Sequence, residues 1–306
     1  MSLMRLKMAI SANFSLIIGI SFFLGLVLPY VEDLPSYVPA ILLGAQLFCS
    51  CFRISLTDAR LIRPADSLAF YLLRFVLLPI VFYFLIEPIA PGLAFCIFFF
   101  FLLPPGTSTP GLGSILGANV SLSLFLVTVS SLLMPIVLPP LMSVTAARSI
   151  NIEASRLFWS SAALIFIPIL LHIPWRMNER AHRWMSENNP WLVVPIISLT
   201  TISAIAKQRS VILGSIGSSL WLFAVSCACY AAAYSVWWCC RKSTVRSVRL
   251  SYCLASGTNN ITLGLVLSLI NFPSEVISFM ALSHASWIAT LIIFKGLSQK
   301  KASQRE

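Results

Sequence analysis

Apolar stretches long enough to cross a lipid bilayer follow one another along almost the whole chain of 306 residues. A spanning helix needs about 20 predominantly apolar residues. Ten stretches fit this pattern, although several are short or interrupted: residues 11–29, 38–53, 67–87, 92–117, 121–144, 157–175, 191–206, 211–240, 250–270 and 275–294. The segments between them are brief. The sequence therefore predicts an all-α polytopic membrane protein of ten transmembrane helices, with residues 1–306 in a single integral membrane domain.

The low content of charged residues excludes most other classes of protein. Charged residues make up 10% of the chain and hydrophobic residues 58%, whereas soluble domains carry about 25% charged residues. A soluble enzyme or a disordered chain is therefore excluded. The net charge of +11 would indicate nucleic-acid binding only if the basic residues shared one face. Here the basic residues lie mostly between the apolar stretches. The lipid bilayer is therefore the expected partner, and nucleic acid is not.

The basic residues also predict an orientation. Positively charged residues stay on the cytoplasmic side of membrane proteins. Sixteen of the 21 Lys and Arg residues fall on the side of the N-terminus, four fall on the other side, and Arg74 lies within a span. This distribution places both termini in the cytoplasm, which requires an even number of spans and so agrees with a count of ten. The short basic N-terminus without a transit segment favours a bacterial inner (plasma) membrane.

Two of the predicted spans are interrupted by residues that break helices. The span 92–117 holds three prolines and three glycines within residues 104–113, and the span 250–270 holds the polar sequence 255–260. Proline removes a backbone donor and clashes with the preceding turn. Transporters place binding sites at such interruptions near the bilayer midplane, where protein or a wet cavity covers the freed backbone. The predicted break and hinge residues are Pro104, Pro105, Gly106, Pro110, Gly111 and Gly257.

The positions of the two breaks predict an internal repeat. They lie in the fourth and the ninth of ten spans, which are the penultimate spans of the first and second halves. Each half, residues 11–144 and 157–294, holds five spans, so the halves have opposite topology. This pattern is typical of two inverted five-helix repeats whose broken helices cross. The alternative is a structural bundle that is merely kinked at these residues.

At these residues the chain resembles a divergent member of the bile acid:sodium symporter family, within the bile/arsenite/riboflavin transporter superfamily. The similarity runs through residues 42–58, 63–64 and 74–79, is most specific over 104–133, and returns at 256–260, where the family carries a Glu-x-Gly-x-Gln-Asn signature. The resemblance implies a six-helix core domain with crossed breaks and a four-helix panel domain. It also implies alternating access and sodium-driven uptake of organic anions.

The resemblance implies sodium ligands, and the sequence departs from them at four positions. Pro110 replaces an asparagine, and Val127 stands where a threonine is expected, next to Thr128. Thr109, Ser123 and Thr128 keep hydroxyl groups at or beside the family's ligand positions. Ala255 stands where the family has a glutamate, and Arg74 stands where it has a glutamine. These departures argue against sodium. The sequence predicts no other metal and no cofactor.

Arg74 needs partners inside the protein. It lies seven residues into its predicted helix, roughly 10 Å deep at about 1.5 Å per residue. An arginine at that depth costs about 2.5–3.5 kcal/mol on insertion scales, and the predicted spans hold no deep carboxylate. Its partners would be backbone carbonyls, Asn259 or Asn260, water or an anion. We interpret it as a permanent cation that either fixes the crossing or binds an anionic substrate; snorkelling to the interface is the alternative.

The breaks carry the remaining candidates for binding. Asn259 and Asn260 are interpreted as substrate or ion ligands, with helix caps and interhelical hydrogen bonds as alternatives. Thr107, Ser108 and Thr109 either line the site or cap the following half-helix. The candidate substrate- and ion-binding residues are therefore Arg74, Thr107, Ser108, Thr109, Ser123, Thr128, Asn259 and Asn260.

These observations predict a secondary transporter that moves a small organic, anionic solute across the plasma membrane by alternating access. One alternative is a sodium-independent carrier of the same fold, which is proton-coupled (for example through His284), facilitative or an exporter. Another is a membrane sensor that transports nothing. An intramembrane enzyme is disfavoured, because the spans hold no deep carboxylate and only scattered histidines. No oligomeric state follows from the sequence.

Overall fold

A computed structural model describes residues 14–35, 37–52, 63–146, 153–240 and 245–303, and these residues are helical almost throughout. In chain order the elements are α2 (Phe14–Val27), the short 3-10 helix η1 (Val31–Asp33), α3 (Val38–Cys51), α4 (Pro64–Leu72), the π-helical segment η3 (Leu73–Leu77), α5 (Leu78–Ile86), α6 (Pro91–Leu102), α7 (Thr109–Leu116), α8 (Val120–Ala146), α9 (Ala154–Met177), α10 (Glu179–Ala206), α11 (Arg209–Gly214), α12 (Ile216–Cys240), α13 (Arg246–Gly257), α14 (Ile261–Asn271) and α15 (Ser274–Ser303). The prediction of an all-α protein is confirmed.

Several of these helices are long and apolar enough to cross a membrane. In the described part of the chain, five helices meet that test alone: Pro64–Ile86, Val120–Ser143, Ala154–Met177, Ile216–Trp238 and Ser274–Ser298. A sixth does so if the two halves of α10, which meet at an angle of 59°, form one span. Shorter apolar helices, including α3, α6 and α14, lie in other predicted spans. The expected limits at residues 11–13 and 53, and both termini, lie outside the described residues.

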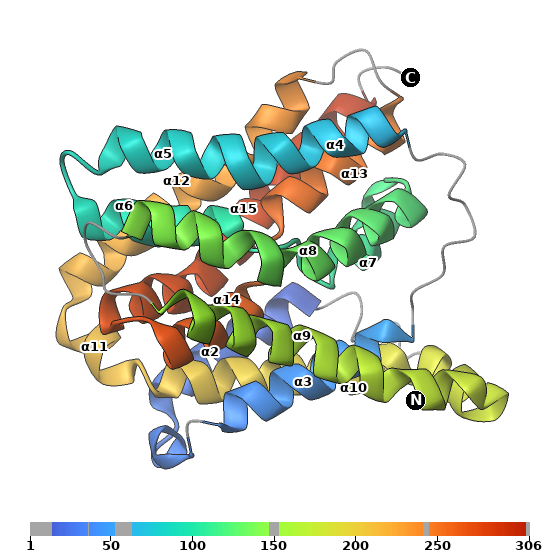
Figure 1. Ribbon diagram of the computed structural model, residues 1–306, viewed down its shortest axis with the longest axis horizontal. Coiled ribbons are helices and arrows are strands. Elements are labelled where there is room, and N and C mark those ends of the chain that lie inside the picture. Colours follow the sequence, from blue (N-terminus) through green and yellow to red (C-terminus); the bar gives the residue numbers. More distant parts are fainter. Residues whose placement is uncertain (1–13, 36, 53–62, 147–152, 241–244, 304–306) are drawn as a thin grey trace.

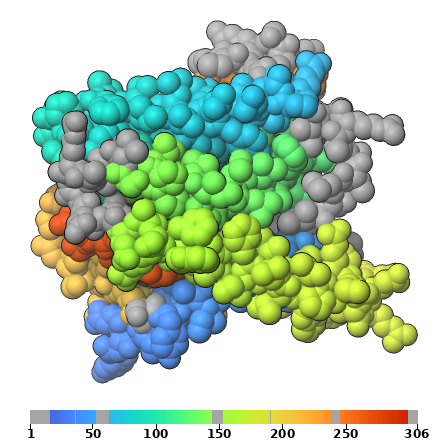
Figure 2. Space-filling view, in the orientation of Figure 1, coloured from blue at the N-terminus to red at the C-terminus, as the bar shows by residue number. Residues whose placement is uncertain are grey.

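The elements fall into two groups (Figure 1). Helices α2 and α3 both pack on α10, and α9 packs on α3, in the lower part of the view. Above them, α4, η3 and α5 form one continuous rod beside α6. Figure 2 shows the same face in space-filling form, with α4 and α5, α8 and α9, and α10 in successive bands. Apolar side chains such as Phe84, Leu170 and Trp159 are exposed on these helices, as expected for surfaces that face lipid.

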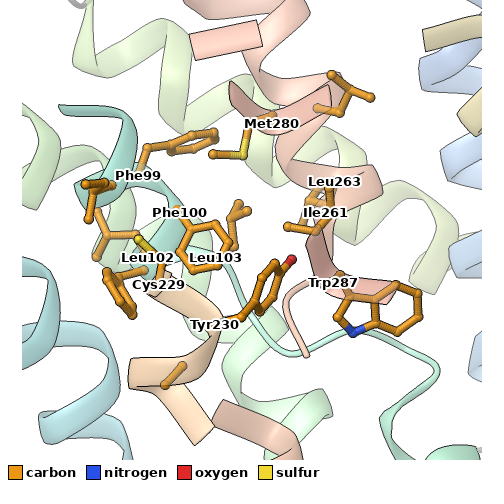
Figure 3. Packing of buried hydrophobic residues seen from close by; sticks show 14 of the residues in the cluster. Phe99, Phe100, Leu102, Leu103, Cys229, Tyr230, Ile261, Leu263, Met280 and Trp287 are labelled. Carbon is orange, nitrogen blue, oxygen red and sulfur yellow. The ribbon is translucent and has the colours of Figure 1, made fainter. Parts of the chain in front are cut away.

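The most deeply buried helix is α6, which leads into the first break. Its residues from Ala94 to Leu102 are all buried, so it is apolar on every side. Figure 3 shows its end within the core, where Phe100 packs edge-on against Tyr230 with ring centroids 4.8 Å apart. The other labelled neighbours come from α12, α14 and α15: Cys229, Ile261, Leu263, Met280 and Trp287. The core therefore surrounds the point at which the helix is interrupted.

Candidate functional site

The two helix breaks predicted from the sequence meet each other. The break between α6 and α7 pairs antiparallel with the break between α13 and α14. The N–H of Gly106 donates to the carbonyl of Thr258 at 2.5 Å, and the N–H of Asn260 donates to the carbonyl of Pro104 at 2.8 Å. Each break therefore satisfies backbone groups that the other has lost, as a membrane protein requires where its backbone leaves the regular helix.

Side chains reinforce the pairing of the breaks. Thr109, at the start of α7, is fully buried, and its Oγ1 donates to the carbonyl of Gly106 at 2.6 Å. The same oxygen lies 2.5 Å from Oγ1 of Thr258, which in turn donates to the carbonyl of Leu254 at 2.6 Å. At Gly257 a Cβ atom would overlap the ring of Tyr234. Only glycine allows α13 to end this close to α12.

Arg74 lies inside the crossing and is 1% exposed, so it does not reach the surface. Its Nε donates to the carbonyl of Ser256 at 3.1 Å, and its Nη2 donates to Oδ1 of Asn259 at 2.5 Å. Its Nη1 donates to the carbonyl of Phe101. The amide nitrogen of Asn259 donates to the carbonyl of Phe100 at 2.8 Å. The guanidinium therefore connects the end of α6, the end of α13 and the second break.

The backbone around Arg74 is π-helical, which the sequence analysis did not anticipate. The N–H of Leu78 donates to the carbonyl of Leu73, five residues back. Pro79 lacks an N–H, so the regular α-helical bond to the carbonyl of Phe75 cannot form. A π-helical turn adds a residue to the turn and recurs at functional sites. Pro79, five residues after the buried arginine, is the sequence signal for this distortion.

A cavity of about 350 Å³ adjoins the crossing. It lies between α3, α9 and α10 on one side and α7, α8 and the start of α14 on the other. Most of its wall is apolar, and its polar groups include Thr107, Ser108, Thr128, Asn189 and Asn260. None of the described residues that line it is charged. Ligand sites are typically concave, mostly apolar and of about 300–1,000 Å³, with a few placed polar groups.

A smaller void of about 30 Å³ lies between the crossing and α15. Gln46 and His284 are among the residues outside the candidate set that line it. Two buried side-chain atoms of residues at this void have no hydrogen-bond partner among the described residues: Oε1 of Gln46 and Nδ2 of Asn260. Asn260 also caps α14, because its Oδ1 accepts from the N–H of Leu263 at 3.2 Å. Such buried unpaired groups are those that a bound solute or water satisfies.

Seven of the eight candidate residues therefore occupy two places. Thr107, Ser108, Thr128 and Asn260 line the larger cavity, whereas Arg74, Thr109 and Asn259 are buried in the crossing itself. The break residues Pro110 and Gly111 also line the cavity.

Two of the three hydroxyls proposed as sodium ligands, those of Ser123 and Thr128, do not share one face of α8. Ser123 is fully buried, and its Oγ donates to the carbonyl of Asn119 at 2.9 Å. It lies beside Gly113 of α7. Thr128 lies five residues further along α8, about 140° around the helix, and its Oγ1 donates to the carbonyl of Leu124 at 2.9 Å. A sodium site at Thr109, Ser123 and Thr128 stays a prediction.

A comparison with known protein families identifies the family of this chain. A model of the sodium bile acid symporter family matches residues 43–215, which is more than half of the chain. The chain belongs to the sodium bile acid symporter family. The matched region covers the first break and the helices α3 to α10, which include most of the cavity wall. The family is one of membrane transporters, which supports transport of a small-molecule solute. No curated protein matches the chain.

Proposed function

We propose that the protein is a secondary transporter that moves a small organic anion across the membrane by alternating access. The observation that carries the proposal is the cavity of about 350 Å³ beside two paired helix breaks. The cavity lies between two groups of helices, so a movement of one group against the other would open it to either side of the membrane. The bound solute would then meet backbone and side-chain groups that the breaks leave available.

In this proposal the chain has ten spans in two inverted repeats, residues 11–144 and 157–294. Helices α2, α3, α9 and α10 form the panel domain, and the remaining helices form the core domain. The packing of α10 on α2 and α3 supports a separate panel, and α9 packs on both α3 and α8, at the boundary between the two domains. The fourth and ninth spans are the broken pairs α6–α7 and α13–α14.

The proposed orientation, with both termini in the cytoplasm of a bacterial cell, rests on the distribution of basic residues. Contacts between segments assigned to the same side support the order of the ten spans. Arg209 forms an ion pair of 2.5 Å with Glu32, which joins η1, in the connection after α2, to the start of α11, after α10. On the side assigned to the cytoplasm, the N–H of Asn119 donates to the carbonyl of Ser247 at 3.2 Å. Each pair joins two connections that the ten-span topology places on one side.

An anionic solute fits the charge pattern at the cavity. The half-helices α7 and α14 begin at the breaks, beside Ser108 and Asn260 respectively. The N-terminus of a helix carries a partial positive charge and free N–H groups. The amide nitrogen of Asn260 and the hydroxyls of Thr107 and Ser108 add neutral donors. No described acidic residue in the cavity wall opposes an anion.

In the first candidate the coupling ion is sodium, as the family resemblance implies. A sodium-independent carrier of the same fold is the second candidate. It is favoured by the guanidinium of Arg74 in the crossing and by Ala255, which is buried in α13 where the family has a glutamate. Uptake measured in proteoliposomes with sodium, potassium or a proton gradient separates the two candidates. Uptake that needs sodium selects the first, and equal uptake in its absence selects the second.

Filling the cavity is expected to abolish transport without unfolding the protein. Leu124→Trp puts an indole into the cavity wall of α8, and it should lower uptake of a bound carboxylate at least about tenfold by excluding it. The matched control is Leu170→Trp, at a position on α9 that is 61% exposed. The measurement is uptake of carboxylates that stabilise the wild-type protein against heat. Normal uptake by Leu124→Trp would contradict the assignment of the site, and binding without uptake by the wild type would favour a sensor.

A further inference from the structure

The carboxyl-terminal ends of two half-helices converge on one guanidinium. Phe101 is the penultimate residue of α6, and Ser256 is the penultimate residue of α13. Carbonyls in the last turn of a helix have no partner within that helix. Arg74 donates to both of these carbonyls and to the amide oxygen of Asn259. Three oxygens from three separate segments therefore surround a single positive charge.

The charges at this point balance without a carboxylate. The end of each helix carries roughly −0.5 of an elementary charge, so the two ends together match the charge of one arginine. In the described part of the chain the ion pair that is found joins Arg209 and Glu32, far along the sequence from this cluster. The rings of Phe75 and Phe101 lie 5.6 and 5.2 Å from the guanidinium carbon and add cation–π attraction.

The position of Arg74 suits a structural role and not the binding of the solute. It is absent from the residues that line the larger cavity and the smaller void. Its Nε, Nη1 and Nη2 all donate to protein oxygens. Three of the five N–H groups of the guanidinium are therefore held by protein oxygens.

We propose that this cluster is a monovalent-cation site that the chain fills with its own guanidinium. Carbonyl and amide oxygens are the ligands that proteins offer to alkali cations. A tethered cation holds the two half-helix ends together permanently, so no diffusible cation binds there or crosses the membrane from there. Shortening Arg74 opens the cage of Phe101, Ser256 and Asn259 oxygens to a small cation from solution. The proposal does not depend on which solute is carried.

The test is the thermal unfolding of purified Arg74→Ala in choline, sodium, potassium and methylguanidinium chlorides at equal ionic strength. We expect Arg74→Ala to unfold at a lower temperature than the wild type in choline. One of the small cations should raise that temperature saturably by about 5 °C or more. The wild type should show no such response. The double variant Arg74→Ala/Asn259→Ala, which lacks one cage oxygen, should lose it.

Three results would overturn the proposal. The first is an Arg74→Ala variant as stable as the wild type in choline. The second is a folded Arg74→Ala variant that responds to all four salts alike. The third is a cation response of the wild type that Asn259→Ala removes, because the cage would then be open already. If Arg74→Ala does not fold in any salt, Arg74→Lys decides. A tethered ammonium should restore folding in choline, and failure to do so overturns the proposal.

Discussion

Replacing Arg74 by methionine is expected to destabilise the protein severely and to abolish transport. Methionine fills much of the same space but has no charge and no donor. The carbonyls of Phe101 and Ser256 and the side chain of Asn259 would then lose the donors that they have now. Removing one partner of a buried charged cluster costs about 3–5 kcal/mol, which is a large part of the total stability of about 5–15 kcal/mol typical of proteins.

The measurement for Arg74→Met is unfolding in a titration with denaturing detergent, together with uptake in proteoliposomes. Arg180→Met is the matched control, because Arg180 is exposed on α10, and its free energy of unfolding should change by no more than about 0.5 kcal/mol. If Arg74→Met kept the stability and the uptake of the wild type, Arg74 would not hold the crossing together.

Replacing Gly257 by alanine is expected to have the next largest effect. The added methyl group would overlap the ring of Tyr234. That ring is 4% exposed and stacks on Phe294 with centroids 4.4 Å apart, so it cannot retreat. Overpacking of this kind costs about 1–3 kcal/mol. Because Gly257 is the last residue of α13, the displacement would fall on the pairing of the two breaks, and uptake should drop at least about tenfold.

A double-mutant cycle tests the cause of that loss. Tyr234→Leu removes the ring that alanine would overlap, so the double variant should be more stable than the sum of the two single changes predicts. Gly217→Ala is the control, because a Cβ there meets nothing within 4 Å, and the higher helix propensity of alanine should leave it equally or slightly more stable. Additive effects of Gly257→Ala and Tyr234→Leu would contradict the steric explanation.

Much of the helical architecture could be predicted because the bilayer demands long apolar helices and because proline and glycine mark their interruptions. Helix limits were harder to predict. The predicted span 191–206 is the second half of α10, which begins at Glu179 and bends by 59°. Charged residues in its first half resemble a solvated connector. The predicted span 211–240 is divided at Ser215 into α11 and α12, within a stretch rich in glycine and serine at residues 214–219.

In the candidate site, too, the sequence predicts only part of the structure. The need of Arg74 for partners followed from its depth in an apolar span. Two of its partners, the carbonyls of Phe101 and Ser256, are backbone groups, and backbone groups have no signature in the sequence. Asn259 was among the expected partners and is one. Thr128 and Ser123 were grouped by resemblance, but the helical period separates them.

The measurement that tests alternating access most directly is the accessibility of the cavity from each side of the membrane. Thr128→Cys places a thiol in the cavity wall, and Ser123→Cys places one at a fully buried position on the same helix as a control. A membrane-impermeant thiol reagent is applied to sealed vesicles of either orientation, and the labelled peptide is identified by mass spectrometry. We expect Thr128→Cys to be labelled from both sides and Ser123→Cys from neither. Labelling of Thr128→Cys from one side only, or from neither, would contradict alternating access through this cavity.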